Sequence, residues 1–164
     1  MLVREATPAD LPALLDIYNE AVVNTTASWD HDPWTAVRHA DWYAHKAENG
    51  FPILVADQDG EVLGYASYSE FSAKAGYSGT REHTVYLRVD ARGRGIGRTL
   101  MEALIGQARA RGVHTLIGRL SADNEPSLRL HAGLGFVEVG RLHEVGRKFG
   151  RWLDLVYLQL MLQD

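Results

Sequence analysis

The sequence contains no cysteine among its 164 residues. Disulfide bonds, thiolate catalysis and cysteine-ligated zinc are therefore excluded. It also lacks a run of about 18 consecutive apolar residues, the length that a membrane-spanning helix requires. The first residues, MLVREATPAD, carry acidic side chains where a signal peptide has an apolar segment. We therefore expect a cytoplasmic protein with no membrane partner.

Motifs for metal and serine chemistry are also missing. The seven histidines are scattered, without an H-E-x-x-H motif or a pair four residues apart, so we expect no metal. Gly76-Tyr77-Ser78-Gly79 lacks the G-x-S-x-G spacing of a serine nucleophile. Zinc hydrolases and serine hydrolases are therefore poor candidates.

Length and composition indicate one folded unit. With 46% hydrophobic residues, the chain can bury one core but is too short for two ordinary domains. No internal repeat or low-complexity tract divides it, so we expect a single domain over residues 1–164. The net charge of −4 argues against a broad nucleic-acid-binding face.

The segment RVDARGRGIGR, residues 88–98, is the most informative in the chain. It concentrates four arginines and three glycines in an otherwise acidic protein. A strand-like segment, TVYLRV, precedes it, and Met101, Leu104, Ile105 and Ala108 follow at helical spacing. The glycines thus lie where a strand passes into a helix, whose first N–H groups and dipole favour an anion such as phosphate. A solvated glycine-rich loop is the structural alternative.

Spacing narrows the class of phosphate ligand. A Rossmann turn requires glycine where Arg98 stands, and a Walker A loop requires Lys followed by Ser or Thr after its second glycine. Neither pattern is present. What remains is Arg-x-x-Gly-x-Gly, formed by Arg92, Gly95 and Gly97.

Local patterns predict an α/β (α+β) fold with a mixed sheet flanked by helices. Strands are expected at residues 2–5, 52–56, 62–68, 84–89, 115–120, 136–145 and 151–162, with a hairpin turn at 58–60. Helices are expected after Pro8, over 36–48, from the glycine turn to Arg111, and over 126–134. The strand at 84–89 is expected near the centre of the sheet.

The Arg92 to Gly97 motif resembles the pyrophosphate-binding turn of the GCN5-related N-acetyltransferase (GNAT) superfamily. The segments REHTVYLRVDARGRGIGRTL, SADNEPSLRLHAGLGF and VGRKFGRWLDLVYLQL are similar to its phosphinothricin/methionine sulfoximine N-acetyltransferase branch, as are IYNEAVVNTTASW and GFPILVA. This resemblance implies a GNAT fold with a central mixed, mostly antiparallel sheet. It also implies transfer of acetyl from acetyl-CoA to the amine of a small amino acid or analogue, by direct attack in a ternary complex.

The resemblance assigns residues to the coenzyme. The backbone of the strand that precedes the glycine turn is expected to lie along the pantetheine, and the turn itself along the pyrophosphate. These residues are Val85, Tyr86 and Leu87, then Arg92, Gly93, Arg94, Gly95, Ile96, Gly97 and Arg98. The Leu87 N–H is a candidate to polarise the thioester carbonyl. Asn124 and Ser127 are expected on the pantetheine arm, although Asn124 also fits a helix N-cap.

Two catalytic residues follow from the same resemblance. Glu82 matches the proposed general base of the branch, which removes a proton from the acceptor amine. His131 stands where many GNAT enzymes carry a tyrosine that protonates the departing thiolate; a structural role is the alternative for a lone helical histidine. Strand alternation places Glu82 on the face of Thr84 and Tyr86.

The acceptor side is expected to include aromatic and polar side chains, namely Trp29, Phe71, Ser72, Lys74, Glu82, His83 and Thr84. Relatives in the branch often carry an arginine for the substrate carboxylate in the loop between the two central strands. This chain has Ser72 and Ser78 there, with Lys74 and Arg81 as possible substitutes. The tail from Val145 to Leu162 resembles a dimer-forming segment, which implies a homodimer.

Three other functions stay open on the sequence alone. A GNAT enzyme can act on a different small amine, or on a protein N-terminus or lysine. A non-catalytic acyl-CoA-binding module would use the same turn without chemistry. A nucleic-acid binder would use the arginine cluster, although the overall acidity counts against it.

Overall fold

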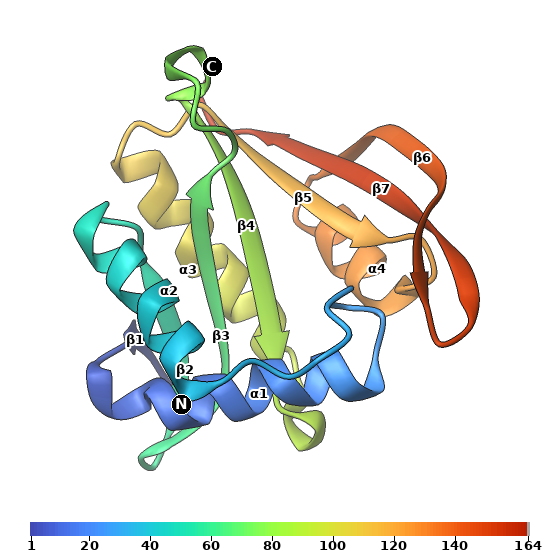
Figure 1. Ribbon diagram of the computed structural model, residues 1–164. Coiled ribbons are helices and arrows are strands. Elements are labelled where there is room, and N and C mark those ends of the chain that lie inside the picture. The colour runs from blue at the N-terminus through green and yellow to red at the C-terminus, as the bar shows by residue number, and fades with distance from the viewer. Residues whose placement is uncertain (164) are drawn as a thin grey trace.

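The computed structural model describes residues 1–163, which form a seven-stranded sheet and four α-helices (Figure 1). The strands are β1 (Leu2–Glu5), β2 (Ile53–Gln58), β3 (Glu61–Glu70), β4 (Thr80–Leu87), β5 (Thr115–Ser121), β6 (Val137–Lys148) and β7 (Arg151–Met161). The helices are α1 (Leu11–Asn24), α2 (Ala36–Glu48), α3 (Ile96–Ala110) and α4 (Glu125–Gly133). No helix in the described range is long and apolar enough to cross a membrane.

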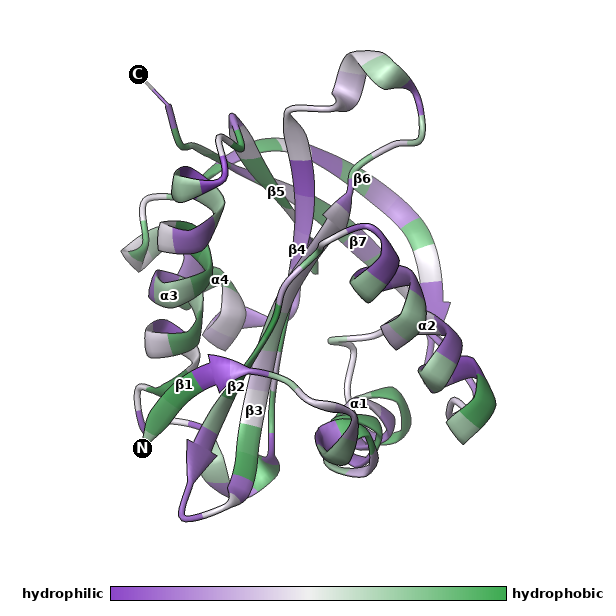
Figure 2. Cartoon of the chain, turned by 90° about the vertical axis from the view of Figure 1, so that its left-hand side faces the viewer, coloured by the Kyte–Doolittle hydropathy of each residue, from purple (hydrophilic) through white to green (hydrophobic). Residues whose placement is uncertain are grey.

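The sheet has the order β1-β2-β3-β4-β5-β7-β6. Adjacent strands of the sheet run antiparallel, except for β4 and β5, which run parallel. The expected mixed, mostly antiparallel sheet is therefore confirmed, with β4 at its centre. Helices α1 and α2 cover one face, and α3 and α4 cover the other (Figures 1 and 2).

Each face of the sheet buries its own apolar cluster. The larger cluster lies under α3 and includes Leu100, Leu104 and Leu116, whereas the smaller one lies under α1 and includes Leu14 and Val55. Strand β4 contributes to both, because successive side chains of a strand point to opposite faces. Val85 and Leu87 pack toward α3, and Tyr86 packs toward α1.

Two-residue turns set the register of both hairpins. Asp59 and Gly60 have φ of 57° and 87°, and Phe149 and Gly150 have φ of 52° and 74°. Positive φ at both central residues is the type I′ turn that suits the twist of a hairpin. The predicted turn at 58–60 is confirmed. The predicted end of β6 at Val145 is wrong by three residues, because the second turn needs only residues 149 and 150.

The helix ends also follow their sequence signals. Helix α2 has the predicted bounds, and the Thr35 hydroxyl accepts a hydrogen bond from the Arg38 N–H at 3.2 Å as its N-cap. Helix α3 begins directly after Gly95 and is followed by Gly112, whose φ is 73°. The predicted passage from strand to glycine turn to helix is confirmed.

Strands β4 and β5 stay together for only three residue pairs. Thr80, Arg81 and Glu82 pair with Thr115, Leu116 and Ile117. Beyond Glu82, β4 continues along β3 to Leu87, while β5 continues along β7 to Ser121. The two strands therefore diverge in the middle of the sheet, as Figure 1 shows.

Candidate active site

A cleft opens where β4 and β5 diverge. It is lined from β4, β5, α4 and the loop after α1 by Ala27, His83, Thr84, Val85, Tyr86, Arg119, Leu120, Ser121, Asn124, Ser127 and His131. Past Glu82, the β5-facing edge of β4 has no strand partner within residues 1–163. Its backbone groups can therefore hydrogen-bond to an extended ligand in the cleft.

Glu82 stands at the point of divergence and forms an ion pair across it. Arg119 of β5 donates from Nε and Nη2 to the same oxygen, Oε1, at 2.9 and 2.8 Å. The Glu82 side chain is 21% exposed and that of Arg119 is 49% exposed. Burial lowers the pKa of Arg119, but the hydrogen bond and charge of Glu82 together with Tyr157 outweigh burial, so the net pKa shift is upward. The site thus holds one carboxylate and one guanidinium; Arg119 lines the cleft, and Glu82 pairs with it where the strands diverge.

His83 lies on the other face of β4 from Glu82. It is 4% exposed, and Gly118 of β5 leaves room for its ring, since a Cβ there would lie 2.9 Å from Cε1. Its Nε2 is 2.8 Å from Nε2 of His131, and both rings pack against Phe136. His83 lines the cleft, but its ring is directed toward α4, so its expected contact with the acceptor stays a prediction.

The hydrogen bonds of the histidine pair define its tautomers. His131 Nδ1 faces the Ser127 carbonyl at 2.7 Å and must donate to it, so Nε2 of His131 accepts from the Nε2–H of His83. Burial, followed by the neighbouring His131, lowers the pKa of His83 to about 3, and burial lowers the pKa of His131. Both rings are therefore neutral at pH 7, and within residues 1–163 Nδ1 of His83 has no hydrogen-bond partner.

Asn124 and Ser127 lie at the N-terminus of α4, beside the histidine pair. The Asn124 side chain accepts from the Ser127 N–H at 3.3 Å, which confirms the N-cap. The Ser127 hydroxyl lies 3.3 Å from Nδ1 of His131. Both side chains line the cleft, so capping the helix and contacting a ligand are compatible.

The glycine turn presents backbone rather than side chains. Gly93 and Gly95 have φ of 73° and 79°, and a Cβ on either would meet no atom within 4 Å. Gly97 differs, because a Cβ there would lie 3.3 Å from Leu130 of α4 and Leu87 of β4. Gly93 and Gly95 therefore allow the backbone to turn and leave space for a ligand to approach it. Gly97 allows α3 to pack closely against α4 and β4.

The arginines around this turn already have polar partners. Arg92 pairs with Glu20 of α1, Arg98 with Glu102 of α3, and Arg88 with Asp90 and Glu61. Arg94 donates to Gln58 at 3.3 Å. An anion at the turn would therefore be held first by the unpaired N–H groups at the start of α3.

The loop between β3 and β4 carries the other expected acceptor residues. The Phe71 ring lies 5.4 Å from that of Tyr77, and the Ser72 hydroxyl accepts from the Lys74 N–H at 3.4 Å. Arg81 donates to the Ser78 and Thr80 carbonyls and lies 5.5 Å over Phe51. Its guanidinium is thus directed toward the loop after α2 and not toward the cleft.

Trp29 lies in the loop between α1 and α2 and packs on β6. Its ring occupies the space that a Cβ on Gly146 would fill. Lys148 ties the same loop to β6, since its Nζ donates to the Thr25 and Ser28 carbonyls at 2.7 and 2.6 Å. Asp30 accepts from Tyr18 and Trp34 at 2.6 Å each, which fixes the rest of the loop.

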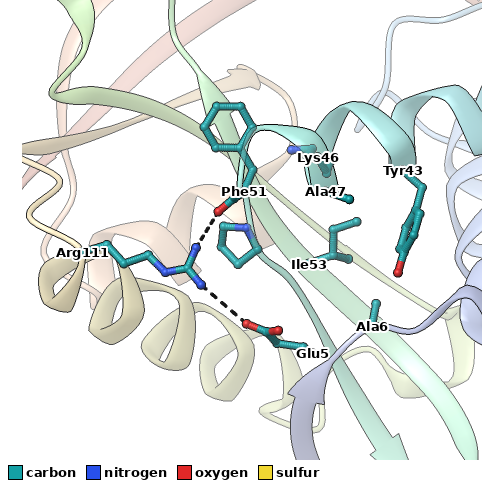
Figure 3. A pocket seen from close by; sticks show the side chains of 10 residues that line it. Glu5, Ala6, Tyr43, Lys46, Ala47, Phe51, Ile53 and Arg111 are labelled. Atoms are coloured by element: carbon teal, nitrogen blue, oxygen red, sulfur yellow. Dashed lines mark hydrogen bonds and ion pairs between the residues drawn. The ribbon is translucent and has the colours of Figure 1, made fainter.

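A second hollow, of about 220 Å³, lies at another place in the fold, between α2 and the end of α3 (Figure 3). Its charged residues have partners. Arg111 donates to the Gly50 carbonyl at 2.6 Å and pairs with Glu5, and Lys46 donates to Tyr68 and Ser69. Burial lowers the pKa of Lys46 to about 8. None of the expected site residues lines this hollow.

Arg119 is the site residue that the sequence analysis missed. It lies 37 positions from Glu82, and only the register of the parallel β4–β5 pair brings the two together. A signal existed, because Arg119 is a charged side chain inside an otherwise apolar strand segment, Thr115–Ser121. Within residues 1–163, no group of three or more His, Asp or Glu side chains is arranged to hold a metal ion.

Comparison with known proteins agrees with this geometry. The model of the acetyltransferase (GNAT) family matches residues 14–136. The chain therefore belongs to this family, which confirms the resemblance of its turn, and it is an N-acetyltransferase.

Proteins similar to this chain include acetyltransferases with named substrates. The chain is 49% identical over 161 residues to the L-methionine sulfoximine/L-methionine sulfone acetyltransferase of Pseudomonas aeruginosa strain PAO1, covering 98% of this chain and 94% of the relative. A phosphinothricin acetyltransferase from Sinorhizobium meliloti, solved in complex with acetyl-CoA, superposes with a TM-score of 0.95 at 36% identity, covering 98% and 88%. A structure from Brucella melitensis, described as a ribosomal-protein-alanine N-acetyltransferase, gives a TM-score of 0.96 at 49% identity, covering 99% and 100%.

Gly95→Val should weaken acetyl-CoA binding by about tenfold or more, because a branched side chain at positive φ strains the turn and obstructs the phosphate. Gly112→Val is the matched control, since Gly112 has a similar φ at the other end of α3. Calorimetric titration of both variants is the measurement. Equal dissociation constants for Gly95→Val and the wild type would refute this coenzyme geometry.

The histidine pair should make stability depend on pH. Because the pKa values of His83 and His131 are lowered on folding, the unfolded chain binds more protons below its pKa of 6.5, and stability falls as pH decreases from about 6.5 toward 3. Each group contributes a limiting slope of about 1.4 kcal/mol per pH unit. His83→Gln should make the slope shallower in urea unfolding at pH 7, 6 and 5. Parallel profiles would contradict this.

Proposed function

We propose that this N-acetyltransferase moves the acetyl group of acetyl-CoA to the α-amine of a small amino acid or analogue. Methionine sulfoximine, methionine sulfone and phosphinothricin are the leading acceptors. The observation that carries the proposal is the carboxylate of Glu82 at the last paired position of β4 and β5, bound to the cleft residue Arg119, in a chain 49% identical to a methionine sulfoximine/sulfone acetyltransferase. The comparisons support this acceptor class through the relatives' names.

Acetyl-CoA fits the cleft through three sets of groups. The N–H groups at the start of α3 receive the pyrophosphate, aided by Gly93 and Gly95. The unpaired edge of β4, from Val85 to Leu87, runs along the pantetheine, and Asn124 and Ser127 face it from α4. We also propose a cytoplasmic location, because acetyl-CoA is an intracellular metabolite.

Glu82 serves as the general base in this proposal. The α-amine of a free amino acid is largely protonated at neutral pH and cannot attack until it loses a proton. Glu82 takes that proton, directly or through one water. The neutral nitrogen then attacks the thioester carbonyl carbon and the C–S bond breaks. The proton that this nitrogen loses as it becomes an amide neutralises the departing thiolate of coenzyme A. No acyl-enzyme is formed.

His131 acts through Ser127 rather than directly on the leaving thiolate. Its Nδ1–H is used by the Ser127 carbonyl, and its Nε2 accepts from His83. His131 and Ser127 both line the cleft, but the His131 ring is only 2% exposed and both of its nitrogens are already hydrogen-bonded. We therefore assign His131 a positioning role that fixes the first turn of α4 and the Ser127 hydroxyl at the cleft.

A protein N-terminus is the second candidate acceptor. The Brucella structure of 49% identity is described as a ribosomal-protein-alanine N-acetyltransferase. A peptide N-terminus presents the same α-amine as an amino acid but carries an amide where the amino acid has a carboxylate. A substrate panel separates the two.

We expect thiol release from acetyl-CoA with the three leading acceptors and little with spermidine or an alanine-ended peptide. Glu82→Gln should lower kcat/KM by about 100-fold or more, since general-base catalysis contributes about 10² to 10⁴. The loss should be largest at lower pH, where less free amine exists without a base. Steady-state rates from pH 6 to 9 are the measurement.

Binding of acetyl-CoA by Glu82→Gln should remain near that of the wild type, which serves as the control for folding. Turnover confined to the polyamine or the peptide would overturn the acceptor and leave the N-acetyltransferase standing. An unchanged pH profile in Glu82→Gln would remove Glu82 from the mechanism.

We further propose a homodimer formed through β6 and β7. Strand β6 is an edge of the sheet, and both strands expose large apolar side chains. These are Val137, Val139, Leu142, Val145, Phe149, Trp152 and Met161, each 44% exposed or more. An apolar edge strand is a surface that commonly pairs with another chain.

Light scattering should therefore give twice the mass of the single chain. The double change Val139→Glu and Leu142→Glu should shift the protein to monomer, because it places like charges on the proposed interface. Val37→Glu on α2, where the side chain is also exposed, is the control and should remain a dimer. A monomeric wild type at micromolar concentration would refute this assembly.

A further inference from the structure

Arg119 is a charged residue that the mechanism above does not use. It projects from β5 on the face opposite to Leu120, which belongs to the cluster under α3. Its guanidinium reaches the mouth of the cleft, where its side chain is half exposed. An ion pair between partly exposed groups adds little to stability, so the fold alone gives no strong reason for an arginine at this position.

The pairing with Glu82 leaves binding capacity on both partners. Both hydrogen bonds end on Oε1 of Glu82, and neither comes from Nη1 of Arg119. A guanidinium presents five donors in a planar fork that matches a carboxylate. A substrate carboxylate can therefore take up the open edge of Arg119 while Glu82 turns its other oxygen to a new donor.

The two side chains together match the two charges of an α-amino acid. In such a molecule, the ammonium and the carboxylate are attached to the same carbon. Glu82 and Arg119 place opposite charges side by side, with nitrogen and oxygen 2.8 Å apart. A zwitterion inserted between them exchanges one ion pair for two, with its ammonium against Glu82 and its carboxylate against Arg119.

We propose that Arg119 binds the α-carboxylate of the acceptor and so selects free amino acids over amines that lack a neighbouring carboxylate. This inference rests on the proposed function and names the residue that sets its specificity. The same contact delivers the α-ammonium to Glu82, which lies on the path of proton removal. Recognition and deprotonation are thus linked through one pair of side chains.

The other cations considered for this role are less well placed. Arg81 donates to two carbonyls of its own loop and lies over Phe51. Lys74 is exposed on the loop after β3, outside the residues that line the cleft. Ser72 and Ser78 supply hydrogen bonds but no charge. Arg119 supplies from β5 the positive charge that this loop does not direct into the cleft.

A double-mutant-type cycle, with one change in the protein and one in the substrate, tests the inference. One change is Arg119→Gln, and the other replaces the best amino-acid acceptor of the panel by its primary amide. Wild type should prefer the acid, and Arg119→Gln should reduce that preference by about 10- to 100-fold, the usual worth of a hydrogen-bonded charge pair. Because the comparison is a ratio, the different basicity of the amide's amine and any effect on Glu82 itself cancel.

Arg119→Lys should retain part of the preference, since it keeps the charge but loses the fork. Arg109→Gln, at the far end of α3, is the matched control and should behave as the wild type. An unchanged preference in Arg119→Gln, or its loss in Arg81→Gln instead, would overturn the inference and leave the proposed function intact. Wild type that acetylates neither the acid nor the amide would defeat both.

Discussion

The site depends on one constraint, the end of pairing between β4 and β5 after three residues. Parallel strands in the middle of a sheet normally satisfy each other's backbone groups, and an unpaired buried group costs about 1–3 kcal/mol. Here β5 keeps its partner β7 along its whole length, so it remains ordered while its other edge turns away. The opened edge of β4 faces a cleft where an extended ligand can replace the lost strand.

The two faces of β4 next to this opening have opposite character. Glu82 points to a half-exposed surface where Arg119 stabilises its charge. His83, one residue further, points into a buried layer where desolvation keeps it and His131 neutral. Strand alternation thus separates a charged surface, where we propose that proton transfer takes place, from a neutral layer that supports α4. A positive charge on either ring would bring a cation into apolar surroundings beside Phe136, which is costly without a counter-ion.

Sequence reasoning was strongest where the signals were local. The glycine turn, the bounds of α2, the cap of α4 at Asn124 and the Asp59-Gly60 turn each depend on a few neighbouring residues, and the structure confirms them. The Glu82 to Arg119 pair and the burial of His83 depend instead on the register between β4 and β5. That register joins residues about 35 positions apart in the sequence, which no local pattern encodes. Resemblance to relatives did not supply Arg119 either.

The loop of Trp29, an expected acceptor-side residue, is held in place by segments far apart in the sequence. Two residues of β6 hold the loop of Trp29. Lys148 donates two hydrogen bonds to carbonyl groups of the loop, and Gly146, which has no side chain, leaves room for the Trp29 ring to pack against β6. Strand β6 has β7 as its only strand neighbour in the described sheet, and it exposes four apolar side chains among its charged ones. A second copy bound along β6 would therefore restrain the strand that fixes Trp29. In the proposed dimer, association through this edge and the position of Trp29 are then mechanically connected, because both depend on the same residues of β6.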